Sequence, residues 1–245
     1  MKFTKGYWMN LPGVTNTDAV QVREVKVEND RVYLYTVPYH ADMRAMGGPL
    51  LEMYISSPQP DIIRTEAYHF MGSNQKMPAF ELNDAHCALE VENTETTVTI
   101  KSGNTKLVIG KNPCSFDYYY KDKKLTSVGN RFGSAMISTI STPDGNYMRA
   151  QMDLDIGEKV YGLGERFTPY VKNGQTVETW NEDGGTCTEI SYKSIPFYIN
   201  EPQLRRACEP TRARSPMRFA PSMLRAYSSP CRAKSSTSWS LAATA

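Results

Sequence analysis

The chain has 245 residues, an ordinary hydrophobic content of 40% and a formal net charge of +2. It is long enough to bury one sizeable core, and it contains no run of about 18 apolar residues, which excludes a membrane-spanning helix. Its start, M-K-F-T-K-G-Y-W, lacks the apolar stretch of a secretory signal peptide, so we expect a cytoplasmic protein without a membrane partner.

Strand patterns dominate the chain. Valines alternate with polar residues from Val20 to Val27, a turn follows at 28–30, and alternation resumes from Val32 to Val37, which predicts a hairpin. The same alternation occurs at 89–91, 98–100 and 148–154, an apolar run follows a turn at 107–109, and 116–120 reads as an aromatic strand. No stretch keeps helical periodicity over three turns. The pattern predicts an all-β fold, an antiparallel β-sandwich that occupies residues 1–200 as one domain.

The cysteines indicate neither a metal site nor a redox motif. Cys87, Cys114 and Cys187 are scattered, Cys208 and Cys231 follow near the C-terminus, and no C-x-x-C pair occurs. Buried or half-buried free thiols are the simplest expectation for the first three. We therefore predict no metal and no cofactor.

The segment Tyr161–Phe167 reads Y-G-L-G-E-R-F and contains two closely spaced glycines. A nucleotide-binding interpretation fails, because no third glycine follows in register and no helix pattern comes next. Gly162 and Gly164 are instead expected to permit a tight turn or a close approach of two backbones. Further along, Asn173-Gly174 predicts a two-residue turn.

The segment Trp180–Thr186 reads W-N-E-D-G-G-T and combines an aromatic ring, an amide and two carboxylates with a pair of glycines. This set suits sugar binding, because the ring can stack on sugar C–H bonds while Asp and Asn side chains hydrogen-bond the hydroxyls. The alternative is a polar turn with a core tryptophan. Composition by itself favours the polar turn.

The composition changes at Asn200. Residues 1–200 hold 20 Lys+Arg against 24 Asp+Glu, a net charge of −4, whereas residues 201–245 hold 8 against 2, a net charge of +6. The later segment is rich in Ser, Ala and Pro and lacks apolar periodicity, so we expect it to be a disordered tail. Three interpretations compete: a basic arm that binds nucleic acid, a linker, and an out-of-frame translation.

The genetic code favours the third interpretation. The run E-P-Q-L-R-R-A-C-E-P at 201–210 can be encoded so that a shifted frame reads N-R-S-Y-G-V-L-V-N. From Met223 the other shifted frame can read H-V-K-S-V-Q-F-S-V-Q-G-E-E-L-D-F. These strings alternate apolar and polar residues as strands do, and the visible strings do not. We therefore expect residues 201–245 to be out of frame, and we expect no nucleic-acid partner.

Three separated motifs resemble the N-terminal part of glycoside hydrolases of family 31, and most closely the bacterial α-xylosidases. They occur in the order in which that family has them. They are M-K-F-T-K-G-Y-W at the start, Y-G-L-G-E-R-F at 161–167 and W-N-E-D-G-G-T at 180–186. The likeness runs through I-P-F-Y at 195–198 and covers residues 1–199. The string N-R-S-Y-G-V-L-V-N also resembles what such proteins carry just after I-P-F-Y.

The resemblance implies a galactose-mutarotase-like β-sandwich that packs against a (β/α)8 barrel. In the family the barrel carries both catalytic aspartates of a retaining glycosidase. Those segments are absent from this sequence, so we expect a truncated enzyme that holds no catalytic residue and is inactive by itself. The implied parent activity releases terminal α-linked xylose from oligosaccharides. The alternatives are an α-glucosidase of the same family and a non-catalytic carbohydrate-binding β-sandwich.

The resemblance also implies a sugar-binding loop. In the family a loop of the sandwich reaches the mouth of the active site, and the W-N-x-D segment is that loop. The role of its aspartate, which contacts substrate hydroxyls, carries over to Asp183, with Asn181 and Trp180 as weaker candidates. Some relatives have threonines after this aspartate where this chain has Gly184-Gly185, so a threonine contact is not expected here.

Overall fold

The computed structural model describes residues 3–5, 9–38, 50–69, 85–128, 137–143, 145–179, 181 and 193–200, together with the backbone of 204–209, 215–220, 223–228 and 236–243. Every regular element in these residues is a β-strand, and every strand pairing is antiparallel. The predicted all-β fold is therefore confirmed. No helix that could cross a membrane occurs in the part of the chain that the structure describes.

The strands form four sheets. A two-stranded sheet pairs β1 (Thr4–Lys5) with β2 (Met9–Asn10). A five-stranded sheet has the order β12 (Lys123–Val128), β11 (Cys114–Tyr120), β10 (Thr105–Lys111), β9 (Thr97–Ser102) and β8 (Glu90–Asn93). A six-stranded sheet has the order β16 (Thr176–Thr179), β19 (Ser215–Ala220), β20 (Met223–Ser228), β14 (Gly145–Asp153), β13 (Ile137–Thr142) and β3 (Thr15–Asp18). An eight-stranded sheet has the order β15 (Val160–Glu165), β17 (Lys193–Asn200), β18 (Leu204–Glu209), β21 (Ser236–Ala243), β7 (Ile62–Tyr68), β6 (Leu51–Ser56), β5 (Arg31–Val37) and β4 (Gln21–Val27).

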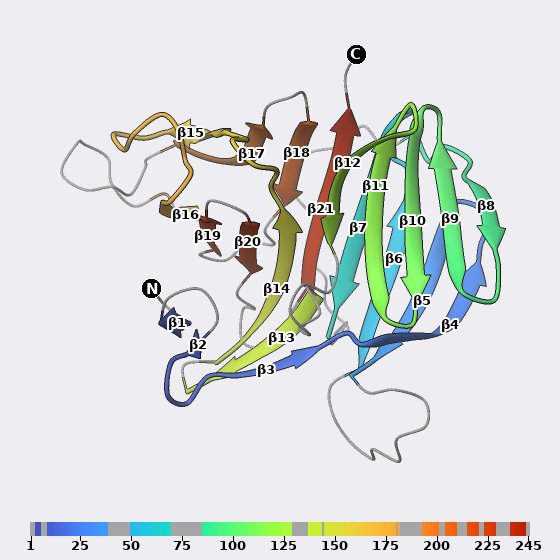
Figure 1. Cartoon of the computed structure of the whole chain (residues 1–245), viewed down its shortest axis with the longest axis horizontal. Coiled ribbons are helices and arrows are strands. Elements are labelled where there is room, and N and C mark those ends of the chain that lie inside the picture. Colours follow the sequence, from blue (N-terminus) through green and yellow to red (C-terminus); the bar gives the residue numbers. More distant parts are fainter. Residues whose placement is uncertain are drawn as a thin grey trace.

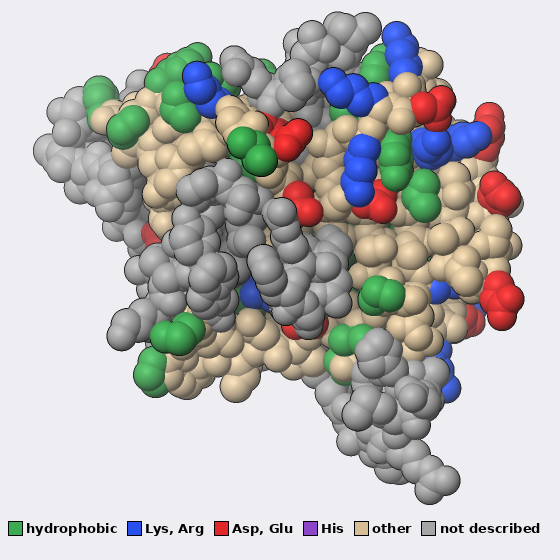
Figure 2. Space-filling model, in the orientation of Figure 1, with side chains coloured by type: hydrophobic (Ala, Val, Ile, Leu, Met, Phe, Trp, Pro, Cys, Tyr) green, Lys and Arg blue, Asp and Glu red, His purple; other side chains and the backbone are tan. Residues whose placement is uncertain are grey.

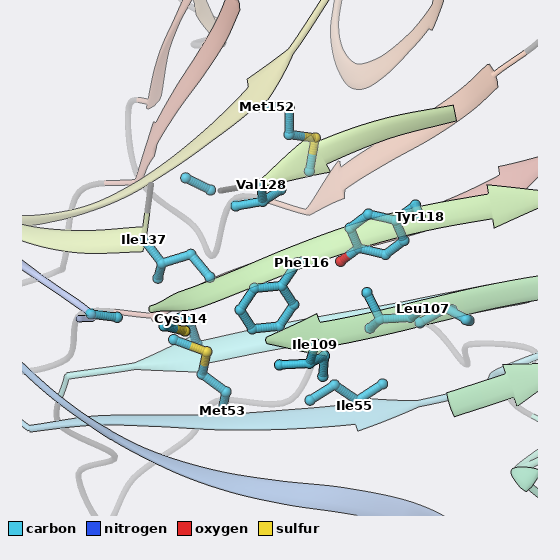
Figure 3. Close-up of a cluster of buried hydrophobic side chains, with 14 of the residues drawn as sticks. Met53, Ile55, Leu107, Ile109, Cys114, Phe116, Tyr118, Val128, Ile137 and Met152 are labelled. Carbon is cyan, nitrogen blue, oxygen red and sulfur yellow. The ribbon is translucent and has the colours of Figure 1, made fainter. Parts of the chain in front are cut away.

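The five-stranded sheet packs face to face on strands β4–β7 of the eight-stranded sheet (Figure 1). Burial alternates residue by residue along β6, β7 and β10, as expected for sheets that have one face in a core. Figure 3 shows this core, whose buried side chains include Met53, Ile55, Leu107, Ile109 and Phe116. The hydroxyls of Thr65 and Tyr118 hydrogen-bond across the two layers at 3.0 Å, so the sandwich also satisfies its buried polar atoms there.

The hairpin predicted at residues 20–37 is confirmed. Strands β4 and β5 pair up to Val27 and Val32, and the amide of Glu28 donates to the carbonyl of Arg31 at 2.8 Å to close the turn. The other segments predicted as strands also lie in strands, namely β8, β9, β10, β11 and β14. Local alternation therefore located most of the sandwich strands.

Of the last 45 residues, the structure describes the backbone of four strands, β18–β21. Strand β18 pairs with β17, β21 with β7 and β20 with β14. β18 and β21 thus lie between β17 and β7, and β19 and β20 lie between β16 and β14. An unpaired strand edge presents N–H and C=O groups that can pair with an extended segment whatever its side chains are. Backbone pairing can therefore place a segment in a sheet although its sequence has no strand periodicity.

Candidate functional site

Of the three predicted sugar-binding residues, the structure describes Asn181. Trp180 and Asp183 lie outside the described residues. Asn181 is exposed and follows the end of β16, and its side-chain Oδ1 accepts a hydrogen bond from the backbone amide of Ser194 at 2.7 Å. Ser194 is the second residue of β17. Asn181 therefore ties the point where the chain leaves β16 to the point where it enters β17.

The two glycines of Y-G-L-G-E-R-F permit a close approach of β15 to β17, as predicted. The pairing of these strands shifts between Gly162 and Gly164, and all three residues of G-L-G have positive φ, at 114°, 72° and 84°. A β-carbon on residue 162 would lie 2.7 Å from the carbonyl oxygen of Phe197. Leu163 adopts the left-handed conformation at a cost of about 1–2 kcal/mol, which its complete burial in the core offsets.

Arg166 follows β15 and reaches both strand ends next to Asn181. Its Nε donates to the carbonyl of Leu163 at 3.0 Å, and its Nη2 donates to the carbonyl of Glu178 at 2.7 Å and to Oγ of Ser194 at 2.9 Å. Burial lowers the pKa of Arg166, but a guanidinium stays protonated at neutral pH. Sequence reasoning missed Arg166 and Ser194 as parts of this site. The only available signal was the place of Arg166 directly after the glycine pair and Glu165.

Side-chain hydrogen bonds within the segment between β15 and β16 hold that segment in place. Nζ of the buried Lys172 donates to Oγ1 of Thr168 at 3.0 Å and to the carbonyl of Pro169 at 2.9 Å. Burial, and secondly the nearby charge of Arg166, lower the pKa of Lys172. Asn173 holds the start of β15, because its side chain accepts from the amide of Val160 and donates to the carbonyl of Glu158, both at 2.9 Å. The predicted turn at Asn173-Gly174 is confirmed, because the amide of Gln175 donates to the carbonyl of Lys172 at 3.0 Å.

One face of the β15–β17 pair exposes apolar side chains to solvent. Along β17, Ile195 and Ile199 are 45% and 38% exposed, whereas Tyr198 and Asn200 between and beside them are buried. The rings of Tyr161 and Tyr170 meet at a centroid distance of 5.4 Å, and Tyr170 is 80% exposed. Hydrophobic side chains gather over this part of the surface, at the upper left of Figure 2. We call this set, Tyr161, Tyr170, Ile195 and Ile199, the β15–β17 patch.

The described residues offer no metal centre, since no group of three or more His, Cys, Asp or Glu side chains among them could hold an ion. The chemistry that the described part of the site can perform is hydrogen bonding by Asn181 and apolar contact by the β15–β17 patch.

Comparison with known proteins identifies the family. A model of the glycosyl hydrolase 31 N-terminal galactose mutarotase-like domain matches residues 52–203. The α-xylosidase XylQ of Lactiplantibacillus pentosus is 33% identical over 207 residues, which cover 82% of this chain and 26% of XylQ. An α-xylosidase of Emericella nidulans is 33% identical over 220 residues, which cover 82% of this chain and 28% of that enzyme. The chain thus spans about a quarter of the length of these relatives.

The fold agrees with this assignment. The solved structure of a cycloalternan-forming enzyme from Listeria monocytogenes, in complex with a pentasaccharide substrate, superposes with a TM-score of 0.73 at 16% identity and covers 96% of this chain and 21% of that one. Because the family model matches more than half of the sequence and two α-xylosidases match 82% of it, the chain belongs to glycoside hydrolase family 31.

Proposed function

We propose that this chain is the N-terminal β-sandwich of an α-xylosidase and that it contributes substrate recognition to the hydrolysis of terminal α-xylosyl residues. The observation that carries the proposal is the 33% identity to two α-xylosidases over 82% of the chain. The reaction retains configuration and needs two carboxylates close together across the scissile bond. We place that pair in a (β/α)8 barrel that these 245 residues do not contain, so no residue of this chain is assigned a catalytic role.

The proposed sugar-binding residues are Asp183, Asn181 and Trp180. The carboxylate of Asp183 would accept hydrogen bonds from sugar hydroxyls, and the ring of Trp180 would stack on sugar C–H bonds. The anchored side chain of Asn181 supports this proposal, because it ties the start of the segment that carries all three residues to β17. A ligand group held in this way loses less freedom on binding, which favours affinity.

The β15–β17 patch is the proposed contact surface for the barrel. An exposed apolar surface on a sandwich is costly in water and is typical of a protein interface. Tyr170, Ile195 and Ile199 supply such a surface beside the proposed sugar-binding segment.

We further propose that residues 201–245 are an out-of-frame translation. Two observations support this origin: the family match ends at residue 203, next to the change in composition at Asn200, and residues 1–200 make up the same share of the chain that the α-xylosidases match. Sequencing of the coding DNA through the codon of Asn200 tests the proposal. Barrel-coding sequence in another frame would support it, and an intact frame whose codons forbid the two alternating strings would overturn it.

The recognition role is tested in a chimera in which residues 1–200 replace the matched part of an α-xylosidase. Asp183→Ala should lower kcat/KM on an aryl α-xyloside by about tenfold to a hundredfold, because a hydrogen bond to a charged group is worth roughly 1.5–3 kcal/mol. Glu92→Ala, which changes an exposed carboxylate on β8, serves as the control. An unchanged kcat/KM for Asp183→Ala removes Asp183 from the site.

A further inference from the structure

The chain enters and leaves the proposed sugar-binding segment at two strand ends that one side chain bridges. Glu178 lies one residue before the end of β16, and Ser194 lies one residue after the start of β17. Arg166 comes from a third segment, directly after β15, and donates from the same Nη2 to the carbonyl of Glu178 at 2.7 Å and to Oγ of Ser194 at 2.9 Å. A guanidinium is planar and holds its donors in a fixed arrangement, so it sets the relative position of both acceptors.

The same serine links Arg166 to Asn181. The side chain of Ser194 accepts from Arg166, while its backbone amide donates to Oδ1 of Asn181 at 2.7 Å. Displacement of Ser194 would therefore move the partner that orients the Asn181 side chain. Arg166 and Asn181 are thus connected by two hydrogen bonds that share one residue.

The register shift between Gly162 and Gly164, which we call the glycine bulge, holds Arg166 in place for this contact. Gly164 pairs directly with Ser194, and Nε of Arg166 donates to the carbonyl of Leu163 at 3.0 Å, inside the bulge. Arg166 is half-buried, so its hydrogen bonds are less exposed to competing water than those of a surface arginine. The sequence G-L-G-E-R therefore combines a close backbone approach with the side chain that uses it.

We propose that Arg166 is a positioning residue, which fixes the two strand ends and, through Ser194, pre-organises the side chain of Asn181 for sugar binding. The expected effect on sugar binding rests on the proposed function. The expected effect on the Ser194 and Asn181 hydrogen bond rests on the geometry alone. Pre-organisation reduces the ordering cost of ligand binding, so its loss should weaken substrate binding more than turnover.

The structural half is tested on the 245-residue chain by residue-resolved hydrogen exchange. The amide of Ser194 reports directly on its bond to Asn181, and Asn181→Ala shows how fast that amide exchanges when the bond is absent. Arg166→Lys, which keeps the charge and loses the planar guanidinium, should speed exchange at Ser194 by about fivefold, as expected for the loss of roughly 1 kcal/mol of local hydrogen bonding. The amide of Val160, held by the Asn173 side chain, should not change. Unchanged exchange at Ser194 in Arg166→Lys overturns the proposal.

Ser194→Ala is the second variant, because it removes the hydroxyl acceptor and leaves the guanidinium in place. It should speed exchange of the residue 194 amide, and adding Arg166→Lys to it should produce less than the sum of the two effects, since both act through one bond. Arg23→Lys, an exposed arginine on β4, is the matched control and should change neither amide. Additive effects would mean that Arg166 does not act through Ser194 and would overturn the proposal.

The functional half uses the α-xylosidase chimera. Arg166→Lys should raise KM for an aryl α-xyloside by about tenfold with kcat within about twofold, whereas a general loss of stability would lower activity without this split. Raised KM in Asp183→Ala with unchanged KM in Arg166→Lys overturns the positioning role and leaves the proposed function standing. Unchanged KM in Asp183→Ala, together with faster exchange in Arg166→Lys, removes the proposed function and leaves Arg166 as the residue that holds Asn181.

Discussion

Gly164 lies so close to Lys193 that a β-carbon on residue 164 would overlap the carbonyl oxygen of Lys193. The same β-carbon would also come within 2.8 Å of the backbone nitrogen of Ile195. Backbone atoms of a paired strand cannot turn aside as a flexible side chain can. The approach of β15 to β17, and with it the contact of Arg166 with Ser194, therefore requires glycine at position 164.

Gly164→Ala should lower the free energy of unfolding more than Gly174→Ala does. Both glycines have positive φ, at 84° and 80°, so both substitutions incur about 1–2 kcal/mol of backbone strain. Only residue 164 adds a collision with backbone, because nothing lies within 4 Å of a β-carbon at residue 174. Urea unfolding of both variants measures the difference. Equal losses would show that β15 and β17 are not in close contact in solution.

Arg149→Met should destabilise the fold by about 3 kcal/mol, because it leaves the half-buried Asp18 carboxylate without its cation. The two side chains pair at 3.0 Å between β14 and β3, and Arg149 is buried. Burial raises the pKa of Asp18 and Arg149 opposes that rise, so removal of Arg149 should raise the pKa further above 3.8. The folded state then holds a proton that the unfolded chain releases.

The loss should therefore be fully present at neutral pH and should shrink as the pH falls through the raised pKa of Asp18. Urea unfolding as a function of pH measures this dependence. Lys106→Met is the control, because its partner Asp122 is exposed and its loss should have little effect. A pH-independent loss in Arg149→Met would contradict the assignment.

Cys114 should resist alkylation in the folded protein, while Cys87 should react. Burial raises the pKa of the Cys114 thiol to about 12, so it stays protonated and shielded, whereas Cys87 is half-buried. The thiolate is the reactive species. Treatment with iodoacetamide at mildly alkaline pH, followed by peptide mass spectrometry, should show label at Cys87 first and at Cys114 only in urea. Equal labelling without urea would contradict the position of Cys114 in the core.

Arg206→Leu should stabilise the chain if β18 forms as described. Position 206 pairs with Tyr198 on one side and with Leu241 on the other, and Leu241 pairs with Ile63. Tyr198 and Ile63 are fully buried, and directly paired positions share a face of a sheet. An apolar residue there should therefore raise the free energy of unfolding by about 1 kcal/mol or more.

Arg205→Leu is the matched control, because position 205 pairs with the partly exposed Ile199. Its effect should stay within about 0.5 kcal/mol. Thermal unfolding of both variants measures the contrast. No change in either variant would support the disordered tail that the composition predicts.

Period-two alternation located most of the sandwich strands but not β6, β7 and β12. The hairpin at residues 20–37 and the strand at 116–120 place alternate side chains in a shared core, so alternate positions must be apolar. The glycines of G-L-G were also interpretable, because a residue without a β-carbon is needed wherever two backbones meet.

The candidate site was predictable only as a segment. W-N-E-D-G-G-T indicated a sugar-binding composition, but its alternative, a polar turn, has the same composition. The residues that hold the segment could not be found in this way. Arg166 reaches acceptors that lie 12 and 28 residues further along the chain, and one of them is a backbone carbonyl, which every residue possesses.

The sequence by itself determined the all-β class, the positions of several sandwich strands, the change in composition at Asn200 and the membership of family 31, because each of these is carried by local residue types and their spacing. Only the tertiary structure decided which strands share a sheet, that Arg166 bridges Glu178 and Ser194, and that the backbone of the tail pairs with β17, β7 and β14. The physical reason is that sheet pairing and side-chain-to-backbone hydrogen bonds use groups common to all residues. Their partners are selected by where the folded chain places them in space.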